Sequence, residues 1–96
     1  MQNILADMHI LADYHLRELD DDHLVIGKGA DGRKNIRHVV RLNASAAYLW
    51  RSVEGKEFDA GTLARLLQEK YGIDAAAAAA DASAILSAWE KSGLVA

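Results

Sequence analysis

The sequence predicts an α+β domain with a three-stranded antiparallel sheet (β1-β2-β3 in chain order) followed by three α-helices. Two observations support this. Apolar residues alternate with polar ones in short runs from Tyr14 to Leu42, and from Asn43 onward they recur at helical spacing. Ninety-six residues, 51% of them hydrophobic, suffice for one core. We therefore expect a single domain over residues 1–96, with the sheet in 14–42 and the helices in 44–92.

Three short runs have the composition of strands, and turn residues separate them. The runs are YHLRELD (14–20), HLVIG (23–27) and IRHVVRL (36–42). The first break is the acidic triplet at 20–22, and the second is the glycine-containing stretch 28–35. Residues 1–13 form an N-terminal extension that allows more than one interpretation. Its apolar residues have rough helical spacing, the segment could be flexible, or residues 9–11 could lengthen the first strand.

The first two helices are predicted from a cap, an apolar stripe and a glycine stop. Asn43 is a good N-cap for the first, and Asp59 for the second. The stripes at i, i+3, i+4 and i+7 or i+8 are Ala46, Leu49, Trp50 and Val53 in the first, and Leu63, Leu66, Leu67 and Tyr71 in the second. Gly55 and Gly72 end them.

The third helix contains six consecutive alanines, 75–80, preceded by Asp74 as a cap. Alanine has the highest helix propensity, and no glycine, serine or proline interrupts the run, so it does not have the composition of a flexible linker. We expect a helix from Ala75 to Ser92, closed by Gly93. One face of it carries Ala75, Ala78, Ala82, Ile85, Leu86 and Trp89.

This order of elements is winged helix-turn-helix-like, with the strands in front, and a winged helix raises the question of DNA binding. The third helix would read the major groove, but its N-terminal turns offer alanines and Asp81 where base or phosphate contacts need Arg, Lys, Asn or Gln. We do not expect a nucleic-acid partner. A winged-helix transcriptional regulator, or a structural or oligomerisation domain, remains the alternative function.

Charge is unevenly distributed in a chain of net charge −3. A small basic zone lies in residues 28–41 and suggests a local anionic partner. It consists of Lys28, Arg33, Lys34, Arg37 and Arg41, against the single acid Asp31. The absence of cysteine and of any apolar run long enough to cross a bilayer leads us to expect a cytoplasmic protein without a membrane partner.

No set of residues points to catalysis. The four histidines, at 9, 15, 23 and 38, lack paired ligand spacing, and Asp20-Asp21-Asp22 lacks the glycine and distal glutamate of a calcium loop. No serine has a paired histidine, and no glycine-rich loop opens a helix. We expect no catalytic residue, no metal and no cofactor, and therefore not an enzyme.

The helical half also carries an ordered set of family motifs. In chain order these are Leu42-Asn43, Ala46-Ala47-Leu49-Trp50, Glu54-Gly55, Leu66-Leu67 to Tyr71-Gly72, Ala80-Asp81-Ala82 and Gly93-Leu94. Over about two thirds of its length the sequence thus resembles the PqqD-like family of RiPP recognition elements, which bind the leaders of ribosomally made, enzymatically modified peptides. GADGRKNIRHVV stands where members serving pyrroloquinoline quinone (PQQ) biosynthesis carry a Tyr-Pro-Glu-Gly-like stretch. We expect a divergent member, and its product stays open.

The resemblance implies a non-catalytic adaptor. The leader segment of a precursor peptide would add as an antiparallel strand along the third strand, in the groove between that strand and the third helix. A partner enzyme, such as a radical S-adenosylmethionine protein, would do the modification. The peptide-binding residues expected on this basis are Ile36, Arg37, His38, Val39, Val40, Arg41, Leu42, Ala78, Asp81, Ala82, Ile85 and Trp89.

Three questions stay open at this point. Strand alternation puts Arg37, Val39 and Arg41 on one face, and we expect the arginines on or beside the exposed face, where acids of a leader could meet them. Ala78 and Ala82 mark either close helix–sheet packing or the floor of the groove, and Asp81 contacts either the leader or the sheet. Exposed edge strands also allow a homodimer by sheet pairing.

Overall fold

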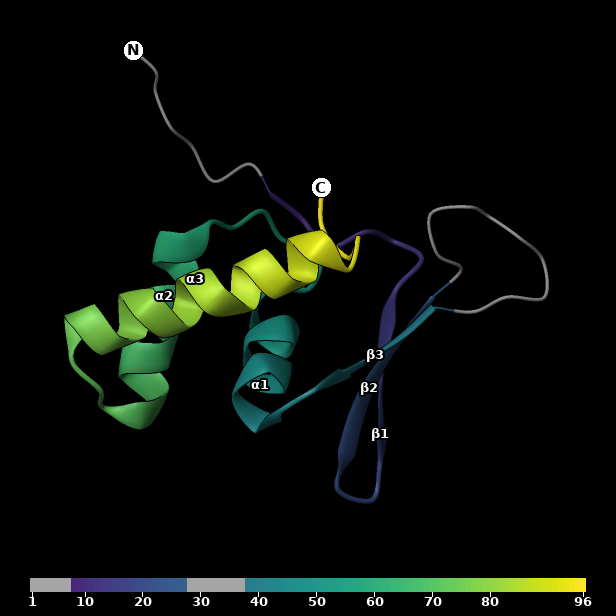
Figure 1. Cartoon of the computed structure of the whole chain (residues 1–96), viewed down its shortest axis with the longest axis horizontal. Helices are drawn as coiled ribbons and strands as arrows, with labels where there is room; N and C mark the ends of the chain where they lie inside the picture. The colour runs from purple at the N-terminus through teal and green to yellow at the C-terminus, as the bar shows by residue number, and fades with distance from the viewer. Residues whose placement is uncertain (1–7, 28–37) are drawn as a thin grey trace, which may run out of the picture.

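The computed structural model describes residues 8–27 and 38–96. Its strands are β1 (His15–Leu19), β2 (Asp22–Gly27) and β3 (His38–Leu42), and its helices are α1 (Ala44–Val53), α2 (Ala60–Tyr71) and α3 (Ala75–Lys91). The strands form one antiparallel sheet in the order β1-β2-β3. Figure 1 shows the helices on one side of the molecule and the β1–β2 hairpin extending away from them. The predicted three strands and three helices are confirmed.

The β1–β2 hairpin is closed by the acidic triplet. Leu19 pairs with Asp22, so only Asp20 and Asp21 lie in the turn. Asp20 has φ 54°, a left-handed conformation that aspartate tolerates better than most residues because its short polar side chain can bond locally. Asp20 and Asp21 thus form a tight turn, as the composition predicts, and Asp22 begins β2.

All three predicted N-caps accept a hydrogen bond from the first turn of their helix. Asn43 Oδ1 accepts from the backbone N–H of Ala46 at 2.8 Å, and Asp74 Oδ1 from that of Ala77 at 2.7 Å. Asp59 forms a capping box with Thr62. Each cap satisfies an N–H that has no partner within the helix, so the helix starts are determined locally. The left-handed φ of 68° at Gly72 ends α2.

Residues 1–7 of the N-terminal extension lie outside the described residues, and residues 8–11 are neither a helix nor an extension of β1. Residues 8–11 are extended and pair with two distant parts of the chain, through the bridges Met8 to Phe58 and Ile10 to Val95. Backbone hydrogen bonds of 2.9 Å join His9 and Ala96 in both directions. The segment therefore attaches the start of the described chain to its end and to the α1–α2 connection.

One hydrophobic core receives side chains from both halves of the chain. At its centre the rings of Trp50 and Trp89 meet edge to face, with centroids 5.4 Å apart and an angle of 78° between the rings. Phe58 packs edge to face on Trp89 from the other side. The sheet contributes Val25 and Leu42. Both tryptophans are core residues.

The alanine run starts a helix whose inner face is buried. Ala78 and Ala82 have no exposed surface at all, while Ala79 and Ala80 between them are exposed. Figure 1 shows α3 crossing close over α2. Small side chains at these two positions allow the helices to approach closely, because a larger side chain would overfill a packed interface. Close packing is observed, but α3 packs mainly against α2 and not, as expected, against the sheet.

Candidate functional site

β3 is an edge of the sheet. It pairs with β2 on one side, and no described strand pairs with the other. An edge strand leaves half of its backbone N–H and C=O groups unpaired, and these can hydrogen-bond an added strand. The start of β3 is held by a hydrogen bond of 3.0 Å between Nδ1 of His38 and the hydroxyl of Tyr14. The Tyr14 ring in turn lies where a Cβ on Gly27 would be, at 2.4 Å, so only glycine fits there.

The two faces of β3 differ as the alternation predicts. His38, Val40 and Leu42 turn towards the core, and Leu42 is buried. Val39 and Arg41 are exposed on the opposite face. The side chain of Arg41 lies 3.8 Å from Asp22, but 73% of its surface is exposed, so the guanidinium can still meet another anion. Arg37 and Ile36 lie outside the described residues.

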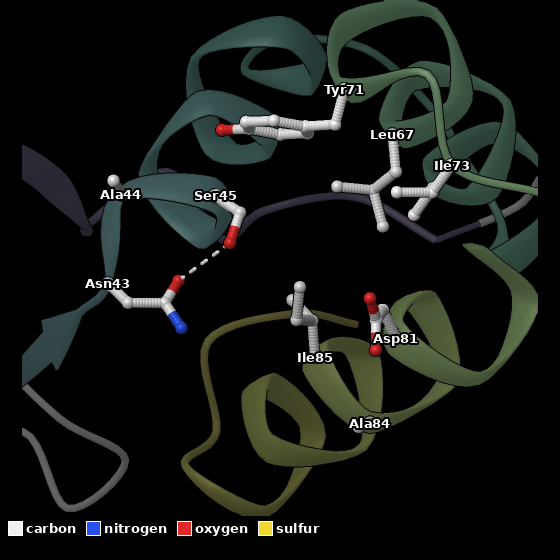
Figure 2. Close-up of a pocket in the computed structure, with 9 residues that line it drawn as sticks. All are labelled: Asn43, Ala44, Ser45, Leu67, Tyr71, Ile73, Asp81, Ala84 and Ile85. Atoms are coloured by element: carbon white, nitrogen blue, oxygen red, sulfur yellow. Dashed lines mark hydrogen bonds between the residues drawn. The ribbon is translucent and has the colours of Figure 1, made fainter. Parts of the chain in front are cut away.

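A pocket of about 680 Å³ opens where β3 ends. It lies between the start of α1, the end of α2 and the middle of α3, and Figure 2 shows Ile85 of α3 pointing towards Leu67 and Ile73. Its volume falls within the range of ordinary ligand pockets. The lining residues are Asn43, Ala44, Ser45, Leu67, Tyr71, Ile73, Asp81, Ala84 and Ile85.

The pocket combines an apolar interior with a polar rim. Asn43 Oδ1 is occupied twice, by the N–H of Ala46 and by the hydroxyl of Ser45 at 3.2 Å, which leaves the amide nitrogen of Asn43 as the donor at the rim. Asp81 lies on the α3 wall beside Ile85 (Figure 2). Among the described residues, no hydrogen bond or ion pair engages its carboxylate.

The predicted site residues separate into three groups. The described part of β3, residues 38–42, forms the edge, and Asp81 and Ile85 line the pocket. Ala78, Ala82 and Trp89 do not reach it: they are 0%, 0% and 2% exposed and belong to the core. Because these three side chains are buried, we do not include them in the site proposed below.

Sequence reasoning missed part of the pocket wall. Tyr71 belongs to the predicted apolar stripe of α2, but it is 46% exposed and lines the pocket. Its place as the last residue of that helix, directly before Gly72, is a signal that it can leave the core. Nothing in the sequence around Ile73 or Ser45 indicates that these residues line a pocket.

The other edge of the sheet, β1, carries a charged cluster. Glu18 pairs with Arg51 of α1 and lies 3.1 Å from Nδ1 of His23 on β2. The hydrogen bond with His23, followed by the charge of Arg51, holds the pKa of Glu18 below its usual value. Charged side chains of this kind are a common protection of an edge against strand addition. β3 is therefore the better acceptor of the two edges.

The family model for coenzyme PQQ synthesis protein D (PqqD) matches residues 27–95, which include β3, the pocket and all three helices. The chain belongs to the PqqD family. Among solved structures, it is similar to a lasso peptide synthetase B1 complexed with the leader peptide, with a TM-score of 0.67 and 18% identity. The alignment covers 94% of this chain and 98% of the other, so the two share a fold. A comparison with curated protein sequences found no match.

The described residues contain neither a candidate metal cluster nor a helix that could span a membrane. In residues 8–27 and 38–96, no three His, Asp or Glu side chains are grouped closely enough to hold a metal ion. No helix in this part of the chain is long and apolar enough to cross a membrane.

Proposed function

We propose that this PqqD-family chain binds the leader segment of a ribosomally made precursor peptide by strand addition to β3. The main support for the proposal is that the edge strand β3 ends at the pocket. Leu42 is its last residue, and the next residue, Asn43, lines the apolar pocket. Backbone pairing supplies affinity for an extended peptide, and a pocket at the end of the strand supplies selection among side chains. The lasso peptide synthetase B1 of similar fold, solved with a leader peptide, supports the same use of this chain.

The direction of β3 gives the direction of the leader. β3 runs from His38 towards the pocket, so an antiparallel partner runs from the pocket towards His38. The N-terminal part of the leader's binding segment then places a large apolar side chain in the pocket, against Ile85 and Ile73. The C-terminal part leaves beside His38, and the segment to be modified follows from there.

Two charged side chains lie beside the proposed position of the leader, and each favours a particular kind of leader residue. Arg41 lies on the exposed face of β3 and favours an acid on the leader strand beside it. Asp81 at the pocket rim favours a donor there, either a basic side chain or a hydroxyl. We propose this contact for Asp81, since its side chain lines the pocket.

The chain acts in this proposal as an adaptor without chemistry of its own. A partner enzyme, for example a radical S-adenosylmethionine protein, modifies the bound peptide. Binding of duplex DNA by α3 is less well supported, because the exposed positions of its first two turns are alanines followed by Asp81.

A binding measurement tests the proposal. A labelled leader peptide, taken from a short precursor gene where one lies beside the gene for this chain, is titrated with the purified protein, and fluorescence anisotropy gives Kd. We expect saturable binding, with a Kd at least about tenfold lower than for a scrambled leader of the same composition, a difference of about 1.4 kcal/mol. Equal affinity for both peptides would show that binding does not depend on the order of the leader's residues, and would contradict recognition by the β3 edge and the pocket.

A further inference from the structure

The pocket at the end of β3 has one charged side chain among the described residues that line it, Asp81 of α3. From Ala75 to Trp89 it is also the single charged residue of that helix. Its side chain is exposed, and within the described part of the chain no hydrogen bond or ion pair engages the carboxylate. The negative charge is therefore available to a bound peptide.

The surroundings of Asp81 in the pocket are apolar. Leu67 of α2 is buried, and Ile73 and Ile85 are half-buried. A leader side chain that fills this space removes water from the carboxylate, which costs free energy unless the side chain supplies a hydrogen-bond donor.

Lysine and arginine meet both requirements of this environment. Their aliphatic stems pack on apolar side chains while the charged head reaches the carboxylate. A charged donor also forms a stronger hydrogen bond with a carboxylate than a neutral hydroxyl does. The position beside Asp81 therefore favours a basic leader residue over an apolar, acidic or hydroxyl-bearing one.

Asp81 and Ile85 lie about one turn apart on the same side of α3, and both line the pocket. Four residues of helix advance about 6 Å along the axis. In an extended leader, side chains that point to the same side are two residues and about 6.7 Å apart. Two successive inward side chains of the leader can therefore contact Ile85 and Asp81.

The proposed direction of the leader determines the order of these two contacts. Figure 2 shows Ile85 between Asp81 and Asn43, the residue that follows β3. An antiparallel leader enters from the pocket and then follows β3, so its residue beside Asp81 precedes its residue beside Ile85. The residue beside Ile85 is the large apolar one proposed above.

We infer that leaders bound by this chain carry a lysine or arginine two residues before the large apolar residue that enters the pocket, with the charged head at Asp81. The inference rests on the proposed function, which supplies the direction of the leader. It adds a class of leader sequence to that function.

A selection from a display library of random peptides tests the inference. The purified wild type, Asp81→Lys and Glu90→Lys are the baits. Glu90 is the matched control, because it is exposed and lies about two and a half turns from Asp81, on the opposite side of α3. We expect the wild type and Glu90→Lys to enrich Lys or Arg two residues before a large apolar residue. Asp81→Lys should enrich Asp or Glu at that position, before the same kind of apolar residue.

The affinity of one selected peptide gives a second measurement. Replacement of its basic residue by glutamate should raise the Kd for the wild type about fivefold or more. Asp81→Lys should prefer the glutamate peptide, and the milder Asp81→Asn should lose the preference for the basic one. Circular dichroism shows whether each variant is folded.

The outcomes separate the inference from the proposed function. Enrichment of apolar residues by the wild type without a base at the stated position would overturn the inference alone. So would an unchanged preference in Asp81→Lys, or an equal change in Glu90→Lys, since the net charge of the protein would then decide the selection. If the wild type enriches no sequence at all, the proposed strand addition is contradicted, and the inference with it.

Discussion

The hydroxyl of Tyr14 lies 3.0 Å from Nδ1 of His38, and it joins the residue before β1 to the first residue of β3. The two rings meet edge to face at 5.8 Å. Because Gly27 of β2 lies against the same tyrosine, one side chain contacts both the central strand and the strand at the edge. This arrangement holds the start of β3 against the central strand.

Tyr14→Phe tests the contribution of that hydrogen bond. The variant keeps the ring against Gly27 and removes the hydroxyl, so we expect a loss of roughly 0.5–1.5 kcal/mol in the free energy of unfolding. Urea unfolding followed by circular dichroism measures it. By contrast, Gly27→Ala must displace the ring and is expected to cost more, about 1–3 kcal/mol. A Tyr14→Phe protein as stable as the wild type would show that the hydrogen bond contributes nothing net.

Ala82→Leu tests whether the alanine face of α3 is a packing surface. Ala82 is fully buried, so three added carbon atoms must displace α2, and we expect a loss of about 1–3 kcal/mol in stability. Ala79→Leu, on the exposed side of the same helix, is the control and should change stability by less than about 0.5 kcal/mol. Equal unfolding midpoints for the two variants would mean that the α2–α3 interface accommodates a leucine at position 82 without loss of stability.

Ala84→Leu tests the pocket without touching the core. Ala84 lines the pocket but is exposed, so a leucine there fills space that the leader's apolar side chain would occupy. We expect leader affinity to fall about tenfold while the urea midpoint stays within error. The control is Ala88→Leu, one turn further along α3, which is exposed and outside the pocket lining. Equal leader affinities in the two variants would remove the pocket from the binding site.

Asp59 gives a prediction about pH. Hydrogen bonds from the backbone and side chain of Thr62 hold the pKa of Asp59 below its ordinary value of 3.8. The cap therefore stabilises α2 fully above pH 3.8, and this contribution is lost as the pH falls through the lowered pKa. Asp59→Ala should cost about 0.5–2 kcal/mol at pH 7, and the gap to the wild type should narrow at pH 2.5. A gap independent of pH would mean that the charged form of Asp59 is not what caps the helix.

The features that the sequence predicted well are local ones. Asn43, Asp59 and Asp74 each cap the helix that follows them, since a cap depends on residues within one turn. The exposed face of β3 followed from alternation alone, as the positions of Val39 and Arg41 show.

The features that it did not predict are set by contacts between distant parts of the chain. Nothing near Met8 indicates that it pairs with Phe58, or that His9 pairs with Ala96. Likewise, helical periodicity puts Ala82 and Ile85 on one face, but only the position of α2 decides that the first is buried and the second lines a pocket. The pocket wall could not be derived for the same reason, because it joins the start of α1 to the end of α2.

The orientation of the bound leader tests the central claim most directly. Two leaders are made, one with a nitroxide spin label at the N-terminus of the binding segment and one with the label at its C-terminus, and each is added to ¹⁵N-labelled protein. We predict that the N-terminal label broadens the amide signals of Ser45, Ala84 and Ile85, and that the C-terminal label broadens those of Gly27 and His38. The reverse pattern, or broadening along β1 with β3 unaffected, would contradict antiparallel strand addition to β3.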